Sequence, residues 1–482
     1  MLLLWDMVKG GEGMLPCPGV MEFEPTREDD CIEDIRLSDG PVRERIIEFL
    51  GGRDLTTSTC VYLARCDSET PSRVERWPVT DLDRLLSNEA ALARSLFDTR
   101  SIIVHLDIEY VNHDDPAAAF TDPWRAFSLQ SPVVAKIEEL LTDWGIRPLH
   151  LITGQGHHFV WRFLRGSELE RRISHLVPSA DPGTSEQTFA NLALMMEYFA
   201  HRIKAVAEEG TEVPVEITAT QVLPGKSGAR ELISIDISEY GDPLDSRMIR
   251  IPFTRYLKPW SSGIARRMGV EGEIGPCVCI PLHEIDVQQA LKFRQDPADV
   301  RDLAMHCSMI IPKQGEGTAR LLEEYLSSSL RVFHQRFYET DHDPPENWAM
   351  TYGRTPLGEL PGCVSHVLQY PNDLLLKPSG MRLVTRCLLA KGWHPRHIAG
   401  LVRSKFEDPV HEWRGCWEGY SPRFRADFYV RLFAGQIATG LDRLSDFHCE
   451  GLQAQGFCWQ VNPPCDLRPF HDILSPTDVT PG

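Results

Sequence analysis

The 482-residue sequence lacks any run of about 18 apolar residues, which is the length that a membrane-spanning helix requires. Its first residues, MLLLWDMVKGGEGMLP, hold an apolar stretch that is too short for a signal peptide and has no basic region ahead of it. Internal repeats and long low-complexity tracts are also missing. These absences predict a cytoplasmic protein with no membrane partner.

A disulfide framework is not expected either. The chain has 13 cysteines, an odd number spread over a long sequence, whereas disulfide frameworks belong mainly to short secreted domains. The cysteines are therefore expected to be reduced thiols, some of them metal ligands.

Acidic residues outnumber basic ones, with 69 Asp and Glu against 50 Lys and Arg. The formal net charge of -19 argues against non-specific coating of nucleic acid. One stretch, 247–267, nevertheless contains no acidic residue and is either a solvated basic face or a local groove for an anion. Its basic residues are Arg247, Arg250, Arg255, Lys258, Arg266 and Arg267.

What is present is an ordinary globular composition, with 42% apolar and 25% charged residues. At roughly 100–200 residues per domain, the length predicts two to four domains. We expect an N-terminal extension (1–40), an α/β catalytic domain (41–270), a helical connector (271–347) and a mainly helical C-terminal domain (348–482). The polar, proline-rich stretch ETDHDPPEN, 339–347, marks the last boundary.

Apolar periodicity predicts the secondary structure. Strands are expected at 60–66, 101–110, 231–240 and 248–253, and a strand–turn–strand hairpin at 147–164. Helices are expected at 41–51, 79–98, 131–144, 186–209, 286–312 and 318–340, with further helices over about 350–475.

The predicted strand SIIVHLDIEY carries two acids, Asp107 and Glu109. Side chains alternate along a strand, so both acids lie on one face while the apolar Leu106 and Ile108 lie on the other. Two carboxylates on one face of a buried strand repel each other unless a cation lies between them, and their oxygens suit Mg²⁺ or Mn²⁺. The alternative is an exposed sheet face with two solvated acids.

The predicted hairpin LITGQGHHFVW contains a Gly-x-Gly-x-His turn. Gly154 and Gly156 allow the backbone to approach a phosphate or a base closely. His158 begins the outgoing strand, and the adjacent His157 must point to the opposite face. Two adjacent histidines do not fit relaxase chemistry, which needs two histidines flanking one apolar residue together with a nucleophilic tyrosine.

A third acid, Asp236, lies in the strand ISIDISEY between two isoleucines, where a carboxylate needs a partner or a metal. Arg250 and Lys258 follow in MIRIPFTRYLKPW and are candidates to hold a triphosphate. Lys226, in LPGKSGAR, is a weaker candidate for a phosphate or template contact. Its G-K-S is not a Walker motif, because the preceding glycine pattern is missing.

Together these residues resemble the archaeo-eukaryotic primase superfamily. That family has an acidic pair on a strand (here LDIE), a small-Gly-x-Gly-x-His hairpin (here TGQGHH) and a third acid on a later strand (here SIDIS). Its Arg-x-Pro-x-Ser/Thr-x-x-x-Lys stretch is similar to Arg250, Pro252, Thr254 and Lys258. The resemblance covers roughly 50–265. The second acid is Glu109 where many members have Asp, and Tyr256 stands where a histidine is usual.

The resemblance implies an α/β fold with a primase catalytic core and an RRM-like sheet, followed by a mainly helical domain. Asp107, Glu109 and Asp236 would hold two divalent cations, Mg²⁺ or Mn²⁺, which activate the attacking 3′-hydroxyl and stabilise the leaving pyrophosphate. His158 would contact the phosphates of the incoming nucleotide. The other nucleotide-binding candidates are Arg250, Lys258, Lys226 and Arg247.

Four cysteines form a second candidate site. Cys363 begins a predicted helix in LPGCVSHVL, and Cys449, Cys458 and Cys465 lie in HCEGLQAQGFCWQVNPPC, with Cys416 as a substitute ligand. Their spacing does not match the C-x-x-C pairs of zinc ribbons. The set resembles the iron–sulfur domain of the primase large subunit, which implies a 4Fe–4S cluster. Zinc and buried free thiols stay open as alternatives.

Helices around these cysteines are rich in basic residues, which we expect to form a nucleic-acid-binding face. The residues are Lys377, Arg382, Arg386, Lys391, Arg396, Arg403 and Lys405.

The leading hypothesis is a primase or DNA polymerase that joins nucleoside triphosphates on a single-stranded DNA template. No helicase motif is present, so unwinding would depend on a helicase or another replication partner. Two alternatives belong to other classes. A metal-dependent nuclease would use the same three acids, and a non-catalytic replication scaffold would keep the motifs only as elements of the fold.

Overall fold

The computed structural model describes most of the chain. The described residues are 40–66, 75–88, 90–178, 183–207, 210–218, 223–224, 227–256, 258–260, 264–265, 277–282, 285–371, 373–411, 420–459 and 465–475. Most of the predicted N-terminal extension, together with Lys226, Arg266, Arg267 and Cys416, lies outside them.

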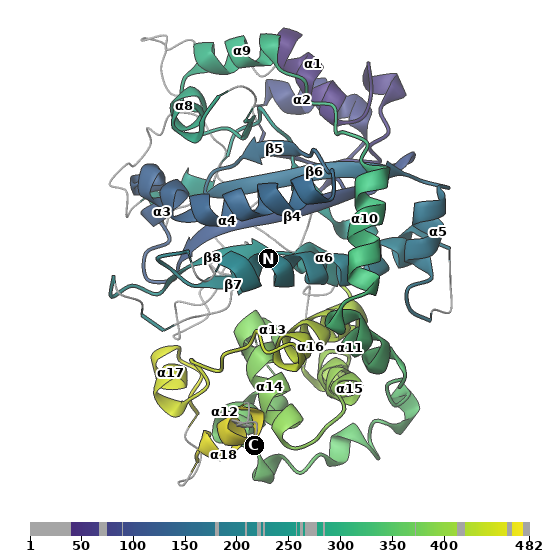
Figure 1. Ribbon diagram of the computed structural model, residues 1–482, viewed down its shortest axis with the longest axis vertical. Coiled ribbons are helices and arrows are strands. Elements are labelled where there is room, and N and C mark those ends of the chain that lie inside the picture. The colour runs from purple at the N-terminus through teal and green to yellow at the C-terminus, as the bar shows by residue number, and fades with distance from the viewer. Residues whose placement is uncertain are drawn as a thin grey trace.

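The chain has a mixed α/β architecture with two β-sheets and a largely helical C-terminal region (Figure 1). Within the described residues, the larger sheet has the strand order β10 (Ile280–Pro281), β5 (Leu149–Ile152), β6 (Gly156–Leu164), β4 (Ser101–Asn112), β8 (Glu231–Asp236) and β7 (Val215–Ile217). The smaller sheet has the order β2 (Arg76–Trp77), β1 (Leu63–Arg65), β3 (Leu92–Ser95) and β9 (Met248–Arg250).

Helices lie around both sheets. The helices up to residue 326 are α1 (Gly40–Phe49), α2 (Leu82–Ser87), α3 (Ala118–Thr121), α4 (Pro123–Asp143), α5 (Glu168–Ser174), α6 (Ser185–Ala207), α8 (Val287–Phe293), α9 (Pro297–His306) and α10 (Gly315–Leu326). The C-terminal helices are α11 (Ser329–Tyr338), α12 (Gly362–Gln369), α13 (Asp373–Leu376), α14 (Pro378–Ala390), α15 (Pro395–Phe406), α16 (Pro422–Ala438), α17 (Cys449–Ala454) and α18 (Arg468–Leu474). No described helix is long and apolar enough to span a bilayer.

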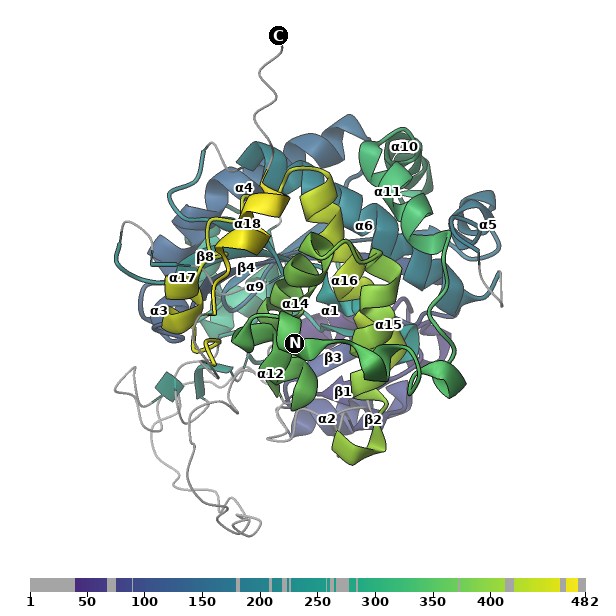
Figure 2. The same cartoon turned by 90° about the horizontal axis from the view of Figure 1, so that it is seen from below.

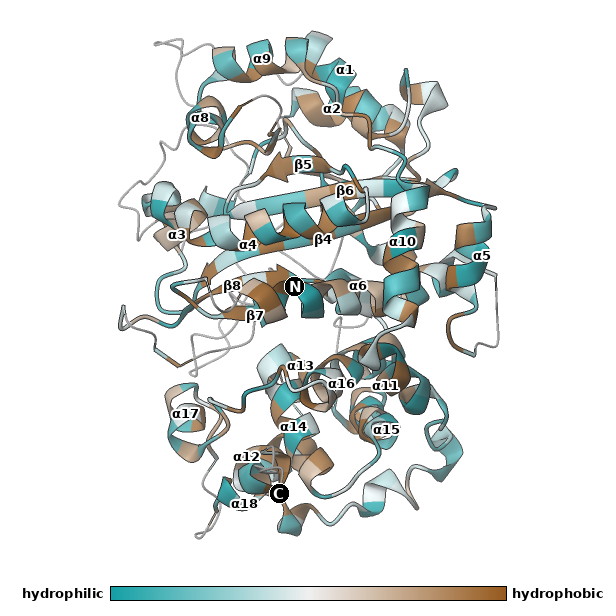
Figure 3. Ribbon diagram, viewed as in Figure 1, coloured by the Kyte–Doolittle hydropathy of each residue, from teal (hydrophilic) through white to brown (hydrophobic). Residues whose placement is uncertain are grey.

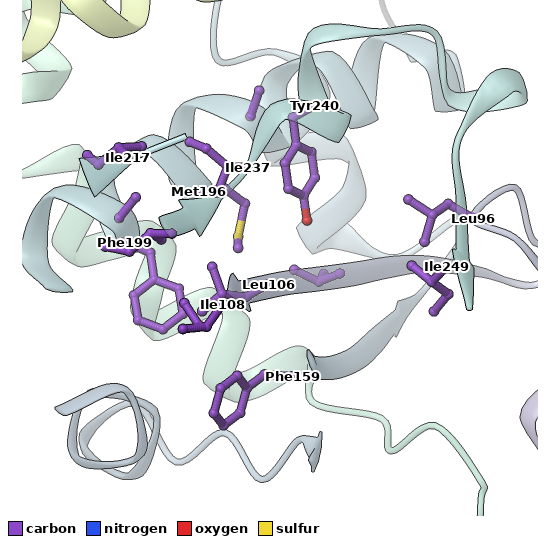
Figure 4. Close-up of a cluster of buried hydrophobic side chains, with 14 of the residues drawn as sticks. Leu96, Leu106, Ile108, Phe159, Met196, Phe199, Ile217, Ile237, Tyr240 and Ile249 are labelled. Atoms are coloured by element: carbon purple, nitrogen blue, oxygen red, sulfur yellow. The ribbon is translucent and has the colours of Figure 1, made fainter. Parts of the chain in front are cut away.

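One part of the apolar core lies between the larger sheet and the two long helices α4 and α6, which Figure 1 shows beside the sheet. Hydrophobic residues, brown in Figure 3, include those of β5 in this sheet. On this side, Leu106 and Ile108 of β4 and Phe159 of β6 are completely buried. Met196 and Phe199 of α6 pack into the same cluster (Figure 4). Because side chains alternate along β4, its opposite face is left to the odd-numbered residues.

Several predicted elements differ from the structure. The helix expected over 79–98 ends at Ser87, and 92–95 form β3, a strand paired on both sides and fully buried, which periodicity alone does not separate from a buried helix. The helix expected over 286–312 is divided into α8 and α9, because Asp296 caps a new helix that begins at Pro297. The strand expected to continue to Tyr240 ends at Asp236.

The helical C-terminal region packs on the rest of the protein through α16 (Figure 2). Glu197 of α6 accepts hydrogen bonds from Arg431 of α16 and is 2.9 Å from His334 of α11, and all three side chains are buried. Arg425 donates to Asp242 at 2.9 Å in a second buried pair. These contacts join the two regions by charge as well as by apolar packing.

The predicted nucleic-acid-binding face on the C-terminal helices is wrong for its central members. Arg386 is buried and donates to Asp442 and Asp446, and Arg382 pairs with the same two acids. Arg396, also buried, pairs with Asp427 at 2.7 Å. Acids from distant parts of the sequence neutralise these arginines, and a helical spacing pattern does not reveal such partners.

Candidate functional site

Strand β4 carries the site on the face that is turned away from α4 and α6. It pairs with β6 on one side and with β8 on the other, both antiparallel. In this register Asp107 lies directly opposite His158 of β6 and directly opposite Asp236 of β8. Three residues predicted from separate motifs therefore form one row across three adjacent strands.

Glu109 extends this row by one step along β4. It lies opposite Gly156 of β6 and Ser234 of β8, and alternation places it on the same face as Asp107. His157 points to the other face, where its ring meets Phe127 of α4 at a centroid distance of 5.1 Å. The opposite directions of His157 and His158 are as the sequence predicts.

The two glycines of the hairpin are needed for packing. A Cβ at Gly156 would lie 1.8 Å from the carbonyl oxygen of Ile108, so no other residue fits there without moving β4 away from β6. A Cβ at Gly154 would lie 2.0 Å from the Tyr256 ring. Both glycines are therefore required by contacts within the protein, and the close approach of a phosphate or a base to this turn stays a prediction.

Burial and mutual repulsion dominate the electrostatics of the two acids. Burial, together with the negative charges of Asp236 and Glu239, raises the pKa of Asp107 to about 8. Burial, followed by the charge of Asp107, raises the pKa of Glu109 to about 8 as well. Within the described part of the chain, neither carboxylate forms an ion pair with a lysine or an arginine. Near neutral pH these two acids hold protons that a cation can replace.

His158 is a neutral imidazole in this setting. Its Nε2 lies 3.4 Å from Oδ1 of Asp107, and burial followed by the charge of His105 lowers its pKa well below the ordinary value. The charge of Arg250 lowers this pKa further. A neutral imidazole offers one N–H donor and one acceptor nitrogen.

Sequence reasoning missed a supporting pair, His105 and Glu239. The His105 Nδ1 is 2.7 Å from a carboxylate oxygen of Glu239, and its ring meets the His158 ring edge-on at 4.5 Å. The Tyr240 hydroxyl donates to the carbonyl oxygen of His105 and accepts from its N–H, on the edge of β4 that β8 no longer covers. The signal for His105 was its even spacing from Asp107 on the same strand.

Two of the predicted cations lie at the site. Lys258 donates to the side-chain oxygen of Gln155 at 2.8 Å, and its charge lowers the pKa values of Asp107 and Glu109. Arg250 lies over the Tyr256 ring at 4.6 Å. Tyr256 itself is buried against the hairpin and has taken the place where the family resemblance leads one to expect a histidine.

Arg247 is placed differently. It forms an ion pair of 3.2 Å with Asp242 and lies over the Tyr420 ring, next to the buried pair of Asp242 with Arg425. Its role as a nucleotide contact stays a prediction. Lys226 lies outside the described residues.

The acid row suits a divalent cation by its donor chemistry. Oδ1 of Asp107 is buried and has no hydrogen-bond partner among the described residues. Two further carboxylates share its sheet face, and hard cations such as Mg²⁺ and Mn²⁺ prefer such oxygens. Among the described residues, however, no three His, Cys, Asp or Glu side chains have the close spacing of a preformed metal cage.

The four predicted cysteines come from separate segments and lie in one neighbourhood. Burial, followed by the thiols of Cys465, Cys458 and Cys449, raises the pKa of Cys363 to about 12. The Gly362 N–H donates to the sulfur of Cys465 at 3.3 Å. The absence of a preformed cage in the described residues applies to this set as well.

A fifth thiol, Cys387 of α14, belongs to the same neighbourhood and was missed. It is fully buried, and its pKa is raised well above the ordinary value by burial and by Cys363 and Cys465. Trp459, next to Cys458, stacks on His366 of α12 with ring centroids 3.9 Å apart. This stacking fixes the cysteine-bearing loop against the helix that carries Cys363.

Comparisons of the chain with protein-family models, with curated proteins and with solved structures found no match.

Proposed function

We propose that this protein is a metal-dependent nucleotidyltransferase, a primase or DNA polymerase that joins nucleoside triphosphates on a single-stranded DNA template. The observation that supports the proposal most is the row of Asp107, His158 and Asp236, which lie directly opposite one another on three adjacent strands. A primase-like catalytic core with an RRM-like sheet is part of the same proposal.

Asp107, Glu109 and Asp236 would hold Mg²⁺ or Mn²⁺. When bound, such cations lower the pKa of an attacking hydroxyl and neutralise charge on the reacting phosphates. The chain's own contribution is to gather three carboxylates on a buried sheet face. Once Asp107 and Glu109 have lost their protons, the carboxylates repel each other, and a bound cation relieves this repulsion.

His158, Lys258 and Arg250 would bind the triphosphate. The neutral ring of His158 donates one N–H to a phosphate oxygen, and it is held in place by the His105 ring. Lys258 and Arg250 supply positive charge at the edge of the acid row. A nuclease that used the same acids would have no need of this set of residues around a triphosphate.

The test is incorporation of labelled nucleotide on a single-stranded DNA template with Mn²⁺ or Mg²⁺. We expect metal-dependent product from the wild type, and a loss of at least about a thousandfold in Asp107→Asn and in Glu109→Gln. Asp143→Asn, an exposed acid at the end of α4, is the matched control and should keep full activity. Cleavage of the template without incorporation would support the nuclease instead, and absence of both would support a binding scaffold.

A second measurement separates nucleotide binding from catalysis. We expect His158→Ala to weaken binding of a nucleoside triphosphate in the presence of Mg²⁺ by about tenfold or more, because a phosphate contact is lost. The exposed His175 provides the matched control, His175→Ala. Equal binding by the two variants would contradict the role of His158.

We further propose that Cys363, Cys449, Cys458 and Cys465 hold a 4Fe–4S cluster. The supporting observation is that three of these thiols act on the pKa of the fourth although they come from segments far apart in the sequence. Anaerobic purification followed by iron, sulfide and zinc analysis tests this. Iron and sulfide that are lost in Cys458→Ser and kept in Cys66→Ser would support a cluster. Zinc in place of iron would favour a structural zinc site. If neither metal were present, the cysteines would be free thiols.

A further inference from the structure

A cavity of about 410 Å³ lies at the far end of β4 from the acid row. Its floor is formed by Ile103 of β4 and by Arg162, the residue opposite it on β6. Ile103 and Asp107 are on the same sheet face because they are four residues apart on one strand, a separation of roughly 13 Å. The volume is within the range of about 300–1,000 Å³ that small-molecule sites usually have.

Arginine dominates the charged lining of this cavity, which we call the arginine pocket. Four arginines line it, namely Arg53, Arg94, Arg100 and Arg162, against two acids, Asp98 and Glu48. Such a concentration of positive charge contrasts with the net charge of -19 of the whole chain.

Both acids of the pocket are already satisfied. Asp98 accepts from Arg94 at 2.9 Å and from the Thr59 hydroxyl at 2.6 Å through one oxygen, and from two backbone N–H groups through the other. Arg94 is completely buried, and its remaining nitrogens donate to backbone carbonyl oxygens. Asp98 and Arg94 therefore form a neutral, rigid base under the pocket.

Glu48, the other acid, is neutralised from outside the pocket. One of its oxygens lies 3.1 Å from Arg45, and the other accepts from the Met309 N–H at 2.9 Å. Three arginines of the pocket are left without a carboxylate partner among the described residues, namely Arg53, Arg100 and Arg162.

Arg162 is the best oriented of the three. Its Nε donates to the Ile311 carbonyl oxygen at 2.7 Å and one terminal nitrogen donates to Ser101 at 3.0 Å, which fixes the half-buried guanidinium in place. Arg53 and Arg100 are exposed at the rim. Ile103, Ile310 and Ile311 give the pocket an apolar wall beside these charges.

We propose that the arginine pocket binds a phosphate-bearing ligand of nucleotide size, with Arg53, Arg100 and Arg162 on its phosphates and the isoleucine wall against its apolar part. Planar guanidinium groups match phosphate oxygens in geometry as well as in charge. The same chemistry is offered by a free nucleotide and by the phosphorylated end of a DNA strand. This site is separate from the acid row, so it does not depend on the proposed nucleotidyl transfer.

The test is direct binding in EDTA, where the acid row has no cation to offer a triphosphate. The probes are ATP, a short 5′-phosphorylated oligonucleotide and the same oligonucleotide with a 5′-hydroxyl. We expect Arg53→Ala/Arg100→Ala to bind the preferred probe at least about tenfold more weakly than the wild type, since two charged contacts are lost. Both positions are exposed, so the double variant is expected to fold.

Two controls make the result specific. Arg336→Ala removes an exposed arginine from α11 and should bind like the wild type. Asp107→Asn should also bind like the wild type in EDTA, whether or not the protein incorporates nucleotides. Stronger binding of ATP identifies a free-nucleotide site, and preference for the 5′-phosphorylated oligonucleotide identifies a strand-end site. Equal binding of every probe by the double variant and the wild type would overturn the proposal.

Discussion

Buried charge is paired where the helical C-terminal region packs on α6, and it has no lysine or arginine partner among the described residues at the acid row. In the helical C-terminal region, buried arginines have carboxylate partners, as Arg431 has Glu197 and Arg386 has Asp442. In contrast, the acids Asp107 and Glu109 of the larger sheet are buried and have no lysine or arginine partner among the described residues. Paired buried charge maintains the architecture, whereas charge that is buried and left uncompensated indicates a place for a ligand.

The pKa values express the same difference. Despite its complete burial, Glu197 has a pKa below its ordinary value, because Arg431 and His334 stabilise the carboxylate. Asp107 and Glu109, equally enclosed, have pKa values raised to about 8 by burial and by neighbouring acids. The first acid is ionised at neutral pH as part of the fold. The other two need a cation in order to be ionised there.

The largest effect is expected when the paired charge is broken. Arg431→Met leaves Glu197 buried without its main partner, which should lower the free energy of unfolding by about 3–5 kcal/mol. Chemical denaturation measures the change. Arg423→Met, an exposed arginine on the same helix, should alter stability by less than about 0.5 kcal/mol. If the two variants were equally stable, the buried pair would not be a structural element.

A steric change at the acid row should have the next largest effect. Gly156→Ala places a Cβ against the Ile108 carbonyl oxygen, where strand backbone must move, so we expect a loss of about 2–3 kcal/mol in unfolding free energy. Gly315→Ala, at the start of α10, has space for the added atom and should be neutral or stabilising by up to about 1 kcal/mol. Equal losses in both variants would show that the close approach of β4 and β6 is not needed.

Neutralising an uncompensated acid should act in the opposite direction on stability. The folded pKa of Asp107, about 8, is above the ordinary value of 3.8, so ionisation of the unfolded chain destabilises the folded protein progressively as the pH rises between these two values. Without divalent cations, Asp107→Asn should therefore be more stable than the wild type by about 1–3 kcal/mol near pH 8. The difference in stability should disappear near pH 4. A variant that is less stable than the wild type at pH 8 would contradict the raised pKa of Asp107.

The smallest effect is a thermal shift with cations. Because a cation must replace the protons of Asp107 and Glu109, Mn²⁺ should raise the melting temperature by about 2–4 °C more near pH 9 than near pH 6. Differential scanning fluorimetry measures this shift. In Asp107→Asn/Glu109→Gln it should be absent at both pH values, and a shift that persists there would locate the cation elsewhere.

The sequence predicted much of the acid row, for a physical reason. Alternation along a strand is a local rule, so it placed Asp107 and Glu109 on one face and separated His158 from His157 correctly. The pairing of Asp107 with both His158 and Asp236 depends on strand register across long connections, which the motif order only indicated. That register became visible in the structure.

The remaining parts were not predictable because their partners are distant in the sequence. Glu239, in the turn after β8, reaches His105 from 134 positions away. Helical spacing predicts a surface position for Arg386, whereas the structure buries it beside Asp442, 56 positions away. The strand β3 was mistaken for helix because all four of its residues are buried, so that both of its faces are covered and its sequence does not alternate between apolar and polar residues.

The ion pair of Glu197 with Arg431 also limits which truncated or chimeric forms of this protein can fold. Its two halves are 234 positions apart, and one belongs to a helix that covers the larger sheet. A truncation that removes α16 would leave a carboxylate at the newly opened surface of α6 and expose the apolar residues around it. In a chimeric protein that exchanges the helical region for another one, Glu197 and Arg431 would have to be kept together, because either one alone is a buried charge without its partner.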